Sequence, residues 1–199
     1  MADAEVPGRA ADEPHEPTPA ELAAIEERKK QRVRGLIALL KDANLNNRWH
    51  AAEMLGEERD PEAVGPLIEA LKDPFVDVQW LAAKSLGQIG DLRALLPLLD
   101  ATTSDDKWLR AGAAWGLGKL KDPRAVERLL VLLKDKKTRV RKEAAWALGS
   151  IADKGAVPGL TEALNDPDSG VRDEAKKALA SIQGEPAEKR ESSSGTASQ

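Results

Sequence analysis

Residues 144–151 read Ala-Ala-Trp-Ala-Leu-Gly-Ser-Ile, and the phrase Ala-Ala-x-x-Leu-Gly within this stretch returns through the chain. Its closing glycine falls at Gly56, Gly87, Gly118 and Gly149, with Ala180 in the fifth place, so each step is 31 residues. A constant period without insertions is typical of a solenoid, in which each unit buries its apolar face against its neighbours. The sequence therefore predicts five stacked copies, at about residues 30–60, 61–91, 92–122, 123–153 and 154–184.

Two apolar patterns within each copy predict two helices. Val64, Leu67 and Leu71 represent the first pattern, and Val78 and Leu86 the second, with the spacings of three and four that one helix face requires. The fold class that follows is an all-α stack of helix-turn-helix units. Aspartate–proline pairs are expected to open the first helix or separate the two helices, and they occur at Asp60-Pro61, Asp122-Pro123, Asp73-Pro74 and Asp166-Pro167. Pro66 and Pro97 fall inside the predicted first helix, where we expect kinks.

These phrases resemble the short HEAT-like repeats first associated with phycobilisome lyases. The matching residues are Asp60 to Asp73, Val140-Arg141, Val171-Arg172 and Ala144 to Ile151. The resemblance covers residues 30–183 and implies a right-handed α-solenoid whose second helices line a concave face. The third copy departs from the pattern between its helices, where Thr102-Thr103-Ser104 replaces Leu-Lys-Asp.

The two ends of the chain differ from the repeats in composition. Residues 1–17 are acidic and proline-rich and residues 185–199 are rich in Ser and Glu, so we expect disordered tails flanking a solenoid at 18–184. Thr18-Pro19-Ala20-Glu21 predicts a capping box that opens a helical extension of the first copy, running into Val33 and Leu40. No apolar run approaches the ~18 residues of a membrane span, and no secretory signal is recognisable at the N-terminus, which predicts a cytoplasmic protein.

Five tryptophans stand out in a chain with one phenylalanine and no tyrosine. At 100° per residue along the second helix, the apolar positions fall at 160–240°, whereas Trp49 and Trp80 fall at about 0°, Trp115 and Trp146 at about 40°, and Trp108 at about 60°. Other copies hold residues such as Lys142, Asp173, Ala111, Glu53 and Lys84 at the two main positions. All five rings are therefore predicted to point away from the core, against the alternative that they are ordinary packing residues.

Exposed tryptophans surrounded by mixed charges are typical of protein interfaces. We therefore expect a scaffold or adaptor, not an enzyme, that binds a protein or peptide partner in a tryptophan-lined groove. Gly112, inside a helix beside Trp115, is expected to leave room for a ligand, and Gly116 to allow close helix packing. The predicted partner-binding residues are Trp49, Trp80, Trp108, Trp115, Trp146, His50, Glu53, Lys84, Gln88, Gly112, Lys119, Lys142 and Glu143.

Other functions remain as alternatives or lack the residues they need. The resemblance allows a bilin or tetrapyrrole lyase or chaperone subunit, with rings stacking on a pigment, and tryptophans also allow single-stranded nucleic-acid binding. The tails hold eight of the 34 acids and three of the 30 bases, so the repeats are nearly neutral, which disfavours nucleic acid; the basic run Arg28–Arg34 predicts a solvated helix face.

No catalytic group, metal site or cofactor is predicted. Deoxyhypusine hydroxylase, an iron enzyme of similar architecture, uses His-Glu pairs, but His50 here precedes Ala51, and His15 lies in the N-terminal tail. A glycosylase-like role lacks an identifiable carboxylate. The recurrent residues Asp42, Asp73, Asp135, Asp166, Arg48, Arg110, Arg141 and Arg172 predict a structural ladder along the stack, because a site would occur once.

Overall fold

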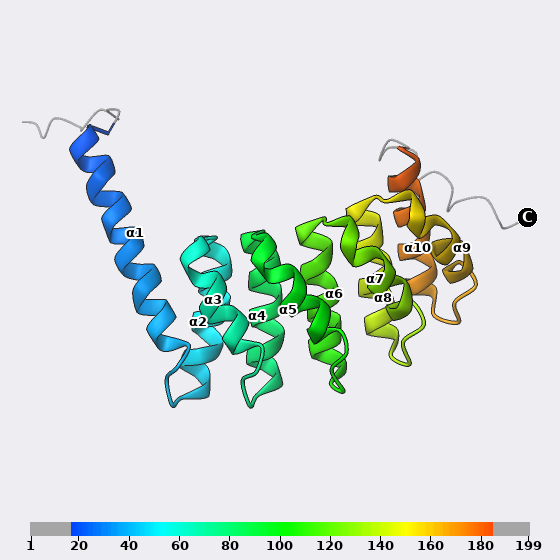
Figure 1. The fold of residues 1–199 in the computed structure, drawn as a ribbon, viewed down its shortest axis with the longest axis horizontal. Coiled ribbons are helices and arrows are strands. Elements are labelled where there is room, and N and C mark those ends of the chain that lie inside the picture. Colours follow the sequence, from blue (N-terminus) through cyan, green and yellow to red (C-terminus); the bar gives the residue numbers. More distant parts are fainter. Residues whose placement is uncertain (1–16, 185–199) are drawn as a thin grey trace, which may run out of the picture. The chain divides into compact units, whose positions relative to one another are not determined.

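The computed structural model describes residues 17–184, which form α-helices and short 3-10 turns with no strand among them (Figure 1). The predicted tails at 1–17 and 185–199 lie outside this range, except for Pro17. The elements are α1 (Pro19–Leu39), α2 (Leu45–Glu58), η1 (Pro61–Ala63), α3 (Val64–Ala70), α4 (Val76–Ile89), η2 (Leu92–Ala94), α5 (Leu95–Ala101), α6 (Lys107–Leu120), η3 (Pro123–Ala125), α7 (Val126–Leu132), α8 (Thr138–Ile151), η4 (Lys154–Ala156), α9 (Val157–Ala163) and α10 (Ser169–Gln183).

The helices keep the 31-residue period of the sequence. The short first helices α3, α5, α7 and α9 begin at Val64, Leu95, Val126 and Val157, and the long second helices α4, α6, α8 and α10 begin at Val76, Lys107, Thr138 and Ser169. The substituted turn of the third copy has the same length as the others, and the Thr102 hydroxyl closes it by donating to Leu99 O at 2.6 Å. The predicted all-α helix-turn-helix pattern is confirmed.

Each first helix starts with a capped 3-10 turn. The Asp60 carboxylate accepts from Glu62 N–H and the Asp122 carboxylate from Arg124 N–H, with a proline at the next position in both turns. Asp91 and Asp153 cap the corresponding turns of their copies without proline. These turns delay the α-helices until Val64 and Leu95. Pro66 and Pro97 thus lie in a first α-helical turn and not in a helix interior, which was the basis of the predicted kinks.

The chain divides into two compact units, residues 1–32 and 33–199, with helix α1 crossing the boundary. In the first unit, the predicted capping box is present: Thr18 Oγ1 accepts from Glu21 N–H, and the Glu21 carboxylate accepts from Thr18 N–H at 2.8 Å. The helix opened by this box was predicted to run into Val33 and Leu40; it includes Val33 and ends at Leu39, and both Val33 and Leu40 are buried in the core of the second unit.

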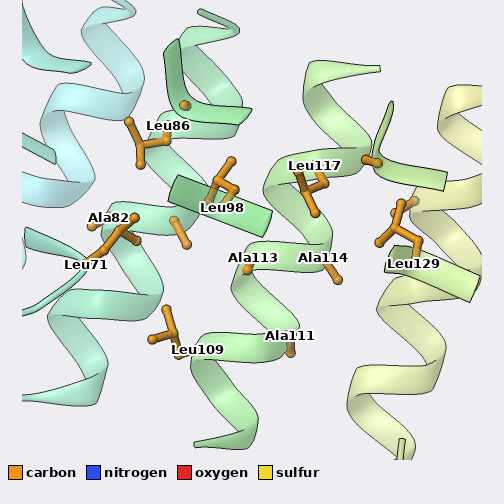
Figure 2. Packing of buried hydrophobic residues seen from close by; sticks show 14 of the residues in the cluster. Leu71, Ala82, Leu86, Leu98, Leu109, Ala111, Ala113, Ala114, Leu117 and Leu129 are labelled. Carbon is orange, nitrogen blue, oxygen red and sulfur yellow. The ribbon is translucent and has the colours of Figure 1, made fainter. Parts of the chain in front are cut away.

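The core of the second unit combines leucines from the first helices with alanines from the second helices. Figure 2 shows Leu98 of α5 beside Leu86 of α4 and Leu117 of α6. Both residues of each Ala-Ala pair are fully buried in α2, α4, α6 and α8. Burying about 25 cal/mol per Å² of apolar surface is the main favourable term for such a stack. Successive second helices pack directly on one another along the whole series.

The repeat glycine is the point of closest approach between successive second helices. A Cβ added at Gly87 would come within 2.6 Å of Gly116 Cα, one at Gly118 within 2.7 Å of Ala147 Cα, and one at Gly149 within 2.7 Å of Ala178 Cα. The glycine lies in the last turn of its helix, and its partner lies 29 residues later on the next second helix. Close packing at Gly116, which the sequence predicted, is therefore confirmed, and the same backbone approach recurs at the next two junctions.

Gly118→Ala should destabilise the protein by about 1–3 kcal/mol, because overpacking outweighs the gain in helix propensity. Gly35→Ala is the matched control, since a Cβ there meets nothing within 4 Å and Gly35 lies inside α1. It should stabilise by about 0.5–1 kcal/mol. Urea unfolding followed by circular dichroism measures both, and equal effects of the two substitutions would contradict the close contact.

Arginine–aspartate ion pairs form rungs between neighbouring copies. Arg48 pairs with Asp73, Arg110 with Asp135 and Arg141 with Asp166, each through two hydrogen bonds of 2.6–3.2 Å. Each arginine also donates to the carbonyls of the turn before its own helix. The side chains are 7–13% exposed. The predicted structural ladder is confirmed for these three pairs, and bidentate geometry is the strong form of this interaction.

One junction lacks both members of the rung. Gln79 stands at the arginine position, where it donates to Asp73 O at 2.6 Å, and Ser104 stands at the aspartate position. The Ser104 hydroxyl still accepts from Asp106 N–H, as Asp73, Asp135 and Asp166 accept from the equivalent N–H groups. Both partners are thus replaced together, so neither charge is left buried without its counterion.

Restoring this rung tests its energetics. Gln79→Arg or Ser104→Asp alone should be neutral or destabilising, since each buries a charge without its partner. The double variant should be more stable than the sum of the two single effects predicts, by about 1–3 kcal/mol of coupling. Chemical denaturation of the four proteins in this cycle measures the coupling, and additive effects would show that the junction cannot form the pair.

Acid should remove the contribution of the existing rungs. Burial raises the pKa of Asp135, but hydrogen bonds from Arg110 and Lys137 N–H outweigh it, and the resulting pKa lies below the usual value. Because the folded-state pKa is depressed, the stabilisation is full above the unfolded pKa of about 3.9 and is lost as pH falls through the folded pKa. Arg110→Ala should cost about 3 kcal/mol at pH 7, and the difference from wild type should shrink below about pH 4. A constant difference across this range would contradict the assignment.

Candidate functional site: the tryptophan–lysine face of the second helices

The thirteen residues predicted to bind a partner all lie on second helices. Helix α2 carries Trp49, His50 and Glu53; α4 carries Trp80, Lys84 and Gln88; α6 carries Trp108, Gly112, Trp115 and Lys119; and α8 carries Lys142, Glu143 and Trp146. The helices α2, α4, α6 and α8 pack in series, so these residues of four successive copies lie along one row of second helices (Figure 1).

Five of these residues contact one another and are called the Trp–Lys cluster: Trp80, Lys84, Trp115, Lys119 and Trp146. The Lys84 ammonium lies 4.6 Å from the ring centroid of Trp80 and 5.5 Å from that of Trp115. The Lys119 ammonium lies 5.2 Å from the Trp115 centroid and 5.9 Å from the Trp146 centroid. The rings of Trp115 and Trp146 stack at 5.7 Å with an interplanar angle of 8°. Cation–π and stacking contacts therefore connect three helices.

The prediction that all five rings avoid the core is wrong for two of them. Trp80 and Trp146 are half-buried and pack against the edge of the hydrophobic core, and Trp115 is also half-buried. Trp49 and Trp108 are exposed, at 38% and 43%. The helical-wheel argument treated each second helix as isolated, but neighbouring second helices cover both its flanks. A large indole on the outer arc therefore leans onto the next helix.

Gly112 accommodates a ring of the protein itself. A Cβ added at Gly112 would come within 2.8 Å of Trp80 Cδ1, so the indole occupies the space that the sequence assigned to a ligand. The absence of a side chain at Gly112 of α6 therefore allows Trp80 of α4 to lie across the junction. Ala111, grouped with water-exposed positions in the sequence, is also buried, at 1% exposure.

A small hollow of ≈ 130 Å³ opens between Trp80 and Trp115, with Ala111 also in its lining and Lys84, Arg139 and Glu143 completing it. Burial raises the pKa of Glu143, while its 2.8 Å ion pair with Arg139 opposes that effect. Arg139 also lies 6.0 Å from the Trp108 ring centroid, and Lys107 lies 5.1 Å from it. Sequence reasoning missed Arg139, although it precedes Gly149 by the ten residues that separate Trp108 from Gly118.

The remaining predicted residues do not join the cluster. Gln88 packs its amide against Gly56 of α2, and the Lys142 side chain lies 3.8 Å from a Cβ position at Gly170 of α10. Trp49, His50 and Glu53 stand on α2, and within residues 17–184 no ring or ion-pair contact joins them to the Trp–Lys cluster.

Two further hollows flank the helices. One of ≈ 410 Å³ lies between α8 and α10, where Trp146, Gly149, Glu174 and Lys177 contribute to its lining. The other, of ≈ 480 Å³, lies between the first helices α7 and α9, and sequence reasoning missed it. Within the described range, no group of three or more His, Asp or Glu side chains is placed to hold a metal ion. No helix in that range has the length and apolarity to cross a membrane.

The fold and this face define a helical-repeat protein of the α-solenoid class. A family model for HEAT repeats matches residues 33–110 and 94–180. The chain belongs to the HEAT-repeat family. A search of curated proteins gives no match.

Solved structures with the same architecture include natural and engineered proteins. The complex of CpcE and CpcF of phycocyanin lyase from Nostoc sp. PCC7120 matches at 26% identity and a TM-score of 0.69, over 92% of this chain and 71% of that chain. An engineered protein matches at 28% identity and 0.59, over 76% and 79%. A designed armadillo repeat protein in complex with the peptide (KR)4 matches at 21% and 0.58, over 83% and 95%, which shows likeness of fold.

The packing of Trp80 against Gly112 can be tested by measuring how Gly112→Ala changes the free energy of unfolding with and without the Trp80 indole. Gly112→Ala should destabilise the wild-type protein by about 1–3 kcal/mol, because the new methyl group meets the indole. In a Trp80→Ala background the same substitution should become neutral or stabilising by up to about 1 kcal/mol, because helix propensity then dominates. Thermal and urea unfolding of the four proteins measure this, and an unchanged effect in the two backgrounds would contradict the packing.

Proposed function

We propose that the protein is a non-enzymatic scaffold that binds a partner protein or peptide on its second-helix face, over the Trp–Lys cluster. The observation that carries this proposal is the gathering of three indole rings and two ammonium groups from α4, α6 and α8 on one side of the stack. Tryptophan is among the residues that most often dominate binding energy at interfaces. One hollow within the cluster, between Trp80 and Trp115, and one beside Trp146, between α8 and α10, supply places for partner side chains.

The structural relatives support binding of another polypeptide. CpcE and CpcF form a complex with one another, and a chain of that complex is similar to this chain over 92% of its length. HEAT repeats expose long, continuous helix faces, a geometry suited to holding an extended or folded partner.

Trp115→Ala should abolish capture of the partner while leaving the fold intact. Trp115 is the most informative ring, because Trp80 and Trp146 also pack against the core. Leu96→Ala is the matched control, since Leu96 is an apolar residue on first helix α5 with 69% exposure. Affinity capture from the source cell, followed by titration of each purified partner, compares the variants. If Trp115→Ala melts like wild type and keeps every partner at full affinity, the proposal is wrong.

A tetrapyrrole-handling lyase or chaperone subunit is the second candidate, favoured by the likeness to phycocyanin lyase. A pigment stacked on the indoles would change its visible absorption. Titrating the protein into a bilin solution and recording the visible spectrum tests this candidate, and an unshifted spectrum eliminates it.

A further inference from the structure

We propose that the Trp–Lys cluster recognises an acidic segment of the partner polypeptide, whose carboxylates bind Lys84 and Lys119. This inference rests on the proposed function and names the chemistry of the partner. A neighbouring apolar side chain of the same segment enters the hollow between Trp80 and Trp115.

In the described part of the chain, the ammonium groups of Lys84 and Lys119 are not engaged in ion pairs on the second-helix face. Among residues 17–184, no carboxylate forms an ion pair with Lys84 or Lys119, whose contacts are with indole rings. Three acids of α8 and α10 form ion pairs of their own: Glu143 with Arg139, Glu174 with Lys177 and Asp173 with Lys176. The unbalanced charge over α4, α6 and α8 is therefore positive, and it sits where the aromatic rings are densest.

The rings hold the two ammonium groups within reach of one bound segment. Both lie near the same ring, at 5.5 Å and 5.2 Å from the Trp115 centroid. A chain in the polyproline II conformation advances about 9 Å per turn of three residues, so carboxylates at every third position lie on one side of it and match two adjacent second helices about 8–10 Å apart. Contact with the rings restrains the lysine side chains before binding, which lowers the entropy lost when a carboxylate arrives.

The hollow supplies an apolar contact beside the charged ones. Its lining includes Ala111, Trp80 and Trp115, while Lys84 and Arg139 bring positive charge to the same place. At ≈ 130 Å³ it holds on the order of four water molecules, which a branched aliphatic side chain can displace. A segment with an acidic residue at every third position and an aliphatic residue beside each acid fits both parts of the site.

A polypeptide fits this face better than single-stranded nucleic acid. Base stacking needs open ring faces, but Trp115 and Trp146 stack on one another and the lysine ammonium groups lie against the same rings. A base would therefore find these ring faces occupied, whereas a carboxylate can bind the ammonium groups directly.

Fluorescence anisotropy with labelled peptides of about twelve residues tests the inference, a length that spans several second helices. The first peptide carries Glu at every third position with Leu beside it, and two matched peptides replace each Glu by Gln or by Lys. An oligothymidylate is the fourth probe. We expect the Glu peptide to bind at least tenfold more tightly than the Gln or Lys peptide, and added salt to weaken it.

Two lysine variants separate a specific contact from general charge. Lys84→Met with Lys119→Met should weaken the Glu peptide about tenfold and leave the Gln peptide unchanged, because the aliphatic stems remain. Lys72→Glu with Lys154→Glu is a control at exposed lysines outside the second helices, and it changes the net charge by more than the first variant. It should leave binding of the Glu peptide within about twofold of wild type.

The outcomes distinguish this inference from the proposed function. If the three peptides bind equally and Trp115→Ala weakens all of them, the acidic preference is wrong while the binding face stands. Tighter binding of the Lys peptide or of the oligothymidylate overturns the inference in the same way. If a captured partner ignores Trp115→Ala, the proposed function itself fails, whatever the peptides do.

Discussion

The close contact between successive second helices is the constraint on which the rest of the structure depends. At three junctions the repeat glycine lies against a glycine or alanine of the next second helix, so the two backbones approach more closely than larger side chains permit. This approach brings the Ala-Ala pairs into the core and places each arginine within reach of an aspartate in the next copy. It also sets the spacing at which an indole on one helix reaches the neighbouring helix.

The sequence was sufficient to predict the fold because equivalent positions in the repeated copies can be compared with one another. Period, helix pairing, aspartate caps and the Arg–Asp ladder all follow from residues that recur in register, and the structure confirms them. The errors about the tryptophan face concern contacts between helices. Trp80 of α4 packs against Gly112 of α6, and a helical wheel drawn for one helix contains no information about its neighbour.

The tryptophans combine packing within the protein with a surface available for recognition. Trp80 and Trp146 pack against the edge of the core, while Lys84 and Lys119 bring positive charge onto the same rings. The ring edges and the ammonium groups, not the open ring faces, are therefore the groups that a partner would contact. This arrangement also explains why the residues predicted on α2 stand apart, since Trp49 has no lysine at the position that corresponds to Lys84. That position holds Glu53.

The joint replacement at Gln79 and Ser104 limits how the copies could be rearranged. A rung joins an arginine of one copy to an aspartate of the following copy, so each copy between two others contributes one residue to the rung before it and another to the rung after it. Exchanging the third and fourth units would place an aspartate against Gln79 and, elsewhere, an arginine against Ser104. Exchange of copies by recombination would therefore leave a buried aspartate or arginine without its partner at the interfaces between copies. The side chains at these interfaces thus restrict the order in which the copies can be stacked.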